Sequence, residues 1–209
     1  MDWKHTVLEL MDQGGWVMWA LLAFSVLSLA AAIERAVALR RANVDPTPLL
    51  TQLNDALLRR RSVADALKVC AAARGPAARV AEAGLHRFSR SSSQLEKSLE
   101  RRAVTEIRRL NRGLGILATV ANVAPLLGFL GTVTGMMESF DALWRDGLNN
   151  PGLVALGIKE ALTTTAAGLI VAVPTQIVYN TLSARVTKIT ADIEAMANFL
   201  LEVREEMTT

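Results

Sequence analysis

The residues best suited to chemistry are hydroxyl and carboxyl side chains set in two long uncharged segments. Thr132 lies in the uncharged run 113–137, the threonines 163–165 lie in the run 161–184, and Glu160 stands at the mouth of the second run. A threonine hydroxyl can orient water or hydrogen-bond a carboxylate, but it does not release a proton near neutral pH. An acid at membrane depth is a candidate for a functional residue. These side chains together predict a polar constriction in an otherwise apolar wall.

Thr132 and Thr165 are predicted to lie near one level. The NNPG turn at 149–152 reverses the chain, and Thr132 lies 17 residues before it while Thr165 lies 13 after it. At 1.5 Å per residue their depths differ by about 6 Å. Two simpler interpretations stay open: each threonine could bond back to its own helix, and Glu160 could be a solvated residue beside Lys159.

Small residues and prolines accompany the hydroxyls. Gly131 and Gly135 form a small-xxx-small pair that lets another helix approach closely, although packing within one chain would also explain the glycines. Each proline frees one helix carbonyl and favours a bend. The residues expected in helix packing and pore lining are Gly128, Gly131, Gly135, Gly168, Pro125 and Pro174.

No carboxylate occupies the middle of either segment, so a proton path would need a titrating group from a second polypeptide. The sequence shows no set of residues typical of an enzyme, and neither a metal site nor a cofactor is expected. His5 and His86 are isolated, and Cys70 is interpreted as a small core residue. The chain has more basic than acidic residues, but nothing else in the sequence indicates nucleic-acid binding.

Three uncharged windows are long enough to cross a bilayer. They cover 13–33, 113–137 and 161–184, and each exceeds the roughly 30 Å of the hydrocarbon core as a helix. The leader before the first window has one lysine and three acids, which does not fit a signal peptide. The sequence therefore predicts an all-α membrane protein with three transmembrane helices.

Charge sets the expected orientation. Of 23 Lys and Arg residues, 17 fall between Arg35 and Arg112, so this long loop is expected in the cytoplasm. The N-terminus is then outside and the C-terminus inside. The tryptophans agree with this orientation, because all four cluster at the outer ends of the windows: Trp3, Trp16, Trp19 and Trp144.

The loop reads as a cytoplasmic helical domain. SVAD at 62–65 fits a capping box, Gly75-Pro76 breaks a helix, and SQLE at 93–96 offers another cap. From that cap we expect one helix to continue straight into the second span, and the third span likewise to extend into the cytoplasm.

The C-terminal segment carries a heptad seam. Its apolar residues alternate at spacings of four and three: Leu182, Val186, Ile189, Ile193, Met196, Leu200, Val203 and Met207. The seam requires a partner helix. Packing on the 93–112 helix of the same chain and contact with a neighbouring copy are both open, and both can hold.

Three stretches resemble the ExbB/TolQ family, relatives of the flagellar stator protein MotA. They are GILATVANVAPLLGFLGTVTGMMESF at 115–140, IKEALTTTAAGLIVAVPTQIVYN at 158–180 and ERAVALRR at 34–41. The resemblance leaves the subfamily open between ExbB-like, TolQ-like and other paralogues.

The resemblance implies a proton-channel subunit of a bacterial inner-membrane motor driven by the proton motive force. It implies a homopentamer around a dimer of a single-span ExbD/TolR-like partner with a transmembrane aspartate, with a TonB/TolA-like protein as a further partner and with lipid contacts. By motif, Thr132 and Thr165 would be pore hydroxyls facing that aspartate, and Glu160 the third-span acid. The alternative is a non-conducting oligomeric scaffold that docks cytosolic partners through its basic loop.

The expected organisation follows in chain order. It comprises a periplasmic or interfacial helix at 1–12, a first span at 13–38, the cytoplasmic domain at 39–112, a second span at 113–140, a periplasmic connection at 141–157, a third span at 158–184 and a cytoplasmic helix at 185–209.

Overall fold

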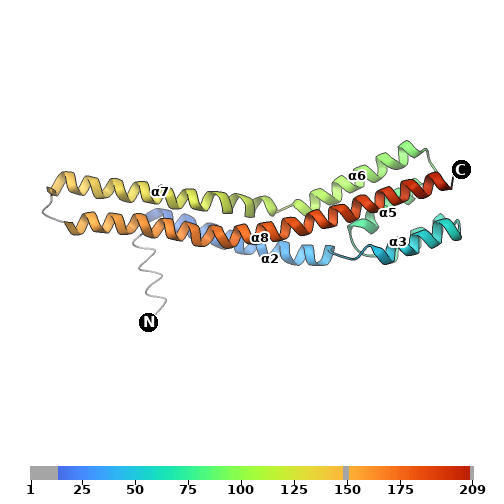
Figure 1. Ribbon diagram of the computed structural model, residues 1–209, viewed down its shortest axis with the longest axis horizontal. Coiled ribbons are helices and arrows are strands. Elements are labelled where there is room, and N and C mark those ends of the chain that lie inside the picture. The colour runs from blue at the N-terminus through green and yellow to red at the C-terminus, as the bar shows by residue number, and fades with distance from the viewer. Residues whose placement is uncertain (1–13, 148–150, 208–209) are drawn as a thin grey trace, which may run out of the picture. The chain divides into compact units, whose positions relative to one another are not determined.

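The computed structural model describes residues 14–147 and 151–207, and this part of the chain is built of helices without a strand (Figure 1). The helix expected at 1–12 lies outside the described residues, as do Trp3, His5 and half of the NNPG turn. The elements are α2 (Gly15–Ala42), α3 (Thr47–Asn54), the short π-helical turn η1 (Asp55–Arg59), α4 (Val63–Ala72), α5 (Pro76–Leu85), α6 (Ser92–Asn111), α7 (Leu114–Asp146) and α8 (Pro151–Glu206).

Helices α2, α7 and α8 are long and apolar enough to cross a membrane. This confirms the prediction of an all-helical fold with three long apolar helices. Helix α7 reaches Asp146 and α8 begins at Pro151, so helix occupies most of the connection expected at 141–157.

The described chain divides into two compact units. The first contains the residues up to Glu34 together with Gly113–Asn180, and the second contains Arg35–Arg112 and the chain from Thr181 onward. Helix α8 therefore contributes its first half to one unit and its second half to the other. The C-terminal helix and the loop domain, expected as separate segments, belong to one unit.

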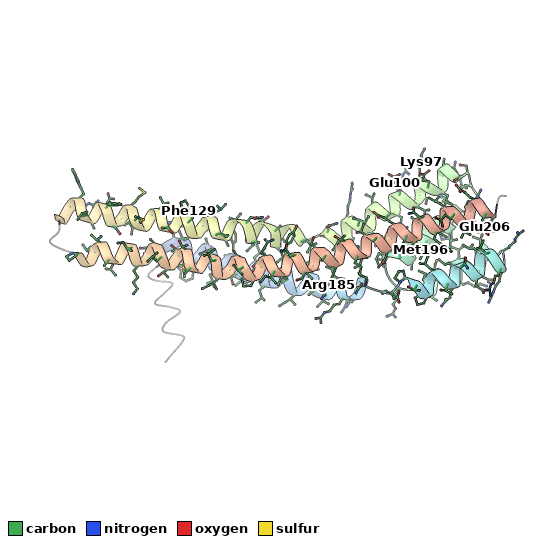
Figure 2. The ribbon with its side chains drawn as sticks, in the orientation of Figure 1. Lys97, Glu100, Phe129, Arg185, Met196 and Glu206 are labelled. Carbon is green, nitrogen blue, oxygen red and sulfur yellow. The ribbon has the colours of Figure 1, made fainter. Side chains whose placement is uncertain are left out.

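The first unit has a small core where its three long helices meet. Val17 and Leu21 of α2 pack with Ala124 of α7 and Ala172 of α8, and all four are buried. Outside this core the unit exposes large apolar side chains, among them Phe129, which Figure 2 labels on α7. Such an apolar surface suits contact with lipid or with other helices.

The expectation of one helix running from the cytoplasm into the second span was wrong. Helix α6 ends at Asn111, and Gly113 has a φ of +85° before α7 begins at Leu114. A left-handed residue cannot continue an α-helix, and glycine adopts this conformation at little cost. Only the third span continues as a single long helix, through all 56 residues of α8.

Local signals predicted the starts of two helices of the second unit, α4 and α5, correctly. The Ser62 hydroxyl accepts a hydrogen bond from the backbone N–H of Asp65 at 3.2 Å, as the capping box predicted. Gly75 takes a φ of +110° and α5 starts at Pro76. The cap expected at Ser93 was wrong, because α6 begins at Ser92 with Ser91 in the capping position.

The C-terminal heptad seam is buried within the second unit. Seven of its eight positions are at most 5% exposed: Leu182, Val186, Ile189, Ile193, Met196, Leu200 and Val203. A Cβ at Gly84 in α5 would lie 2.5 Å from the side chain of Leu99 of α6 and 3.2 Å from that of Leu200 of α8. Packing within the chain therefore occupies the seam, while contact with a neighbouring copy stays a prediction.

Cys70 is buried, which confirms the prediction of a core residue. Burial, together with the nearby charge of Glu82, raises the pKa of the thiol to about 12. The thiol is therefore neutral and unreactive at physiological pH.

Glu106 is the only carboxylate buried among the described residues of the second unit, and two arginines neutralise it. Its carboxylate accepts a hydrogen bond from Arg79 at 2.6 Å and lies 3.1 Å from a guanidinium nitrogen of Arg102. Burial opposes ionisation of Glu106, but the hydrogen bond and the positive charges outweigh it, so its pKa lies below the ordinary value of 4.5. The ion pair ties α5 to α6.

Replacing Glu106 with glutamine is expected to lower the free energy of unfolding by about 2 kcal/mol at pH 7. Removing one partner of a fully buried pair costs about 3–5 kcal/mol, and the partial exposure of both arginines reduces that figure. Because the folded pKa is depressed, the stabilisation is complete above the unfolded value of 4.5 and is lost as the pH falls through the folded pKa. Thermal unfolding in detergent at pH 7 and pH 3 measures this, and an equal difference at both values would contradict it.

Candidate functional site

Four glycines bring α7 and α8 into close contact in the first unit. A Cβ at Gly128 would lie 3.0 Å from the carbonyl oxygen of Thr164, one at Gly135 would lie 2.7 Å from the carbonyl oxygen of Gly157, and one at Gly168 would lie 2.7 Å from that of Ala124. Gly131 is closed in by the side chain of Thr164. The glycines thus let two helix backbones touch within one chain, which is the packing part of their predicted role.

The Gly135→Ala substitution tests this contact. Because the nearest atom is backbone and cannot rotate away, the added methyl group should separate the helices and lower the free energy of unfolding by about 1–3 kcal/mol. Gly115→Ala is the matched control, since nothing lies within 4 Å of its Cβ position and α7 is helical there too. We expect Gly115→Ala to be neutral or slightly stabilising in thermal unfolding, and a similar loss in both variants would exclude a specific contact at Gly135.

The hydroxyls of Thr132 and Thr165 meet between α7 and α8. The two oxygen atoms are hydrogen-bonded to each other, which agrees with the prediction that Thr132 and Thr165 lie near one level. Thr165 also donates to the carbonyl of Gly128 at 3.1 Å, and Thr132 lies 3.3 Å from the carbonyls of Gly128 and Ala161. Both side chains are only partly buried. The bond of Thr132 with the Gly128 carbonyl is a back-bond within α7. The other bonds of the pair run between helices, so back-bonding to one helix accounts for only part of them.

The pair has more acceptor capacity than donor capacity. Two hydroxyls hold two hydrogens and four lone pairs, and the neighbouring carbonyls of Gly128 and Ala161 can only accept. A ligand that donates a hydrogen bond finds free lone pairs, whereas a carboxylate must draw a hydroxyl hydrogen away from a carbonyl. A hydrogen bond to a charged acceptor is about twice as strong as a neutral one, so this exchange is favourable for an ionised acid.

Two further polar residues of the same interface have packing roles that the sequence did not predict. Thr164 is fully buried and donates to the carbonyl of Ala161 at 2.9 Å, so the neighbour of Thr165 is a packing residue. Ser139 is also buried and donates to the carbonyl of Val154 at 3.1 Å, against Gly157. The signal that could have identified Ser139 is its spacing of four residues from Gly135, which continues the small-residue face of α7.

Glu160 belongs to α8, away from the middle of that helix, and its side chain lies beside the start of α2. A Cβ on Gly15 would be 2.8 Å from its Oε1 atom. Gly15 is the first residue of α2, where unpaired backbone N–H groups favour a carboxylate. The side chain is partly buried. The structure therefore places the acid in contact with α2, a contact that the sequence did not predict.

The two prolines have different surroundings. Both lie inside helices that continue through them, Pro125 in α7 and Pro174 in α8. Pro125 is partly buried on the helix that carries Thr132, whereas Pro174 is exposed. Pro174 is thus outside the contact between α7 and α8, and its predicted place in a pore lining depends on other chains.

The geometry defines an all-helical membrane protein whose second and third apolar helices join through glycines and share a hydroxyl pair. The chain belongs to the MotA/TolQ/ExbB proton channel family, whose family profile matches residues 72–195. This confirms the resemblance found in the sequence and makes the chain a member of a proton-channel family.

Several curated relatives carry ExbB names. The chain is 29% identical over 194 residues to the biopolymer transport protein ExbB of Neisseria meningitidis, which covers 86% of each chain. It is 37% identical over 110 residues to ExbB of Pseudomonas putida, covering 52% of this chain and 33% of that protein. It is 31% identical over 182 residues to an ExbB homolog of Methanothermobacter thermautotrophicus, covering 87% and 64%. The chain thus spans between one third and two thirds of the length of the last two relatives.

Proposed function

We propose that this chain is the ring-forming subunit of a proton-driven motor in the bacterial inner membrane, built around a single-span partner. The observation that carries the proposal is the hydroxyl pair of Thr132 and Thr165, formed between two helices that are long and apolar enough to cross a membrane. A membrane interior offers no water to satisfy polar groups, so a partly exposed hydroxyl cluster there indicates a polar ligand.

The ligand is inferred to be a carboxylic acid on another chain. The sequence has no Asp or Glu between Gly113 and Met137, or between Ala161 and Ala184. Threonine cannot titrate near neutral pH, so proton transfer needs an acid from elsewhere. An ExbD/TolR-like partner with a transmembrane aspartate would supply it, as the resemblance implies.

Protonation would control how tightly that acid is held. The ionised carboxylate draws the threonine hydroxyls toward itself and is retained by charge-assisted bonds. Once protonated, it keeps only neutral hydrogen bonds and can leave the pair. Each charge that crosses the membrane releases about 2.3 kcal/mol per 100 mV, so a few protons per cycle can reorganise a helix contact.

The assembly we propose is a homopentamer that encloses two copies of the partner. The N-terminus would be periplasmic and the C-terminus cytoplasmic, with Thr132, Thr165 and Glu160 along the proton path. The envelope process served is TonB-dependent transport, Tol-Pal function or a related process, and the partner's periplasmic part or a TonB/TolA-like protein would transmit the work.

Copurification and proton flux test the proposal. The tagged chain should copurify with a single-span protein that has an intramembrane Asp, and the complex in liposomes should take up protons when a potential is applied. The matched control is the same complex with that Asp replaced by Asn. A complex that conducts equally well with Asn, or a chain that binds no such protein and never conducts, would favour a non-conducting scaffold.

A further inference from the structure

The second unit carries a concave, strongly basic surface, here called the basic groove. It has a volume of about 460 Å³ and lies along α6 and the end of α5. Its lining contains five cationic side chains and no carboxylate: Arg87, Arg90, Lys97, Arg101 and Arg102.

Most of this charge is uncompensated within residues 14–147 and 151–207. Arg102 is 3.1 Å from Glu106, but in the described part of the chain no carboxylate lies within ion-pair distance of the other four cations. Like charges collected on one concave surface repel one another and attract an anionic ligand. The lining residues Gln94 to Thr105 extend over 11 residues of α6, about 16 Å. The groove therefore suits an elongated anionic partner.

The same unit carries an acidic surface of matching length on α8, here called the acidic stripe. Four exposed residues recur at intervals of four and so share one helix face: Glu194, Asn198, Glu202 and Glu206. They extend over 12 residues, or about 18 Å. The surrounding stretch 189–206 contains five acidic residues and a single basic one, Arg204.

The two surfaces lie at the same height along the helices. Leu99 and Leu200 meet beside Gly84, which sets the level of α6 against α8. The two helices run in opposite directions, as Figure 1 shows, so one step back along α6 corresponds to one step forward along α8. Lys97 is then level with Glu202, and Figure 2 labels Lys97 on α6 and Glu206 at the far end of α8.

The described part of the chain contains no ion pair between the acidic stripe and the basic groove. One chain thus exposes two surfaces of similar length, at the same height along the helices and of opposite charge. Copies related by rotation about an axis along the helices would bring the stripe of one copy to the groove of the next.

We propose that the basic groove of each copy binds the acidic stripe of α8 from a neighbouring copy. This inference rests on the proposed ring. The contact would be heterologous, since each copy uses one surface on each side, and a ring closes without an unpaired surface. Its energy is electrostatic, so it weakens as the salt concentration rises.

Charge reversal tests the contact. In Lys97→Glu/Arg101→Glu, and separately in Glu194→Lys/Glu202→Lys, we expect the ratio of rings to monomers in mild detergent to fall about tenfold, because each exposed pair contributes modestly and both are turned repulsive. All four substitutions in one chain restore opposite charges and should return the ratio to within about twofold of wild type. Native mass spectrometry at low and high salt measures this. Arg61→Glu/Arg74→Glu, with the same change in net charge outside the groove, is the matched control.

Cross-linking identifies the occupant of the groove. In a Cys70→Ala background, one tagged copy carries Thr105→Cys in the groove and a second copy carries Ala195→Cys beside Glu194, so a disulfide between the two sites can only join chains. We expect a cross-linked dimer after mild oxidation. Ala103→Cys, on the far side of α6, replaces Thr105→Cys as the control and should not cross-link.

The results separate this proposal from the proposed function. A ring population that is insensitive to charge reversal, or equal cross-linking at residues 103 and 105, would overturn the contact. Rings that stay intact while copurification of another acidic protein is lost would also overturn it, because the groove would then serve that protein. The Thr132→Val/Thr165→Val variant should cross-link like wild type, so failure of proton flux alone says nothing against this contact.

Discussion

Replacing both Thr132 and Thr165 with valine is expected to lower proton flux through the partner-bound complex by about 100-fold. Valine keeps the shape of threonine but removes both hydroxyls of the pair. An ionised partner acid would lose two charge-assisted hydrogen bonds, each worth about 1.5–3 kcal/mol, and every 1.4 kcal/mol changes a rate tenfold. Flux is measured as uptake of protons by liposomes under an applied potential.

The fold should survive this double substitution. The carbonyls of Gly128 and Ala161, which the hydroxyls now contact, lie inside continuous helices. Each keeps its place in the backbone ladder, so the loss is confined to the site. Thermal unfolding and ring assembly should match those of wild type.

Two controls make the result specific. Thr134→Val removes a hydroxyl that bonds only within α7, to the carbonyls of Leu130 and Gly131, and should leave flux unchanged. Thr132→Ser/Thr165→Ser keeps both hydroxyls and should retain most of the flux. Wild-type flux in the double valine variant would remove the hydroxyl pair from the proton path.

The sequence was sufficient for features set by long runs and simple geometry. Three uncharged windows predicted three apolar helices because a charge at bilayer depth is costly. The pairing of Thr132 and Thr165 followed from counting outward from one turn, since two antiparallel straight helices keep their register over this distance. The buried heptad seam on α8 was likewise visible as a period, although its partners were not.

Features set by single backbone angles or by choice between neighbours were not predictable. Gly113 interrupts the helix through its positive φ, and the length of an uncharged run carries no information about a single backbone angle. Thr164 and Thr165 are adjacent threonines, and only the packing of α8 on Gly131 and Gly128 decides which one is buried. The contact of Glu160 with Gly15 joins residues 145 apart in the chain, and no local pattern links them.

The contact of Glu160 with Gly15 leads to a second prediction. Glu160→Gln is expected to lower proton flux about tenfold, which corresponds to about 1.4 kcal/mol, without changing ring assembly. The carboxylate sits at the first residue of α2, where the helix dipole favours negative charge. A negative charge at the edge of the uncharged run 161–184 attracts protons to the path, and glutamine keeps the size of the side chain while removing that charge. Flux is measured in the same liposomes.

Position, as well as charge, should matter for Glu160. Gly15→Ala would put a methyl group 2.8 Å from Oε1 and strain a residue with a φ of +57°, so it should displace the carboxylate and reduce flux in the same direction. Asp141→Asn, which removes another exposed acid from α7, is the matched control and should have little effect. If Asp141→Asn and Glu160→Gln lowered flux equally, general surface charge would explain both. If neither did, Glu160 would be a solvated residue at the helix end, and the proton path would depend on the threonine pair and the partner's acid alone.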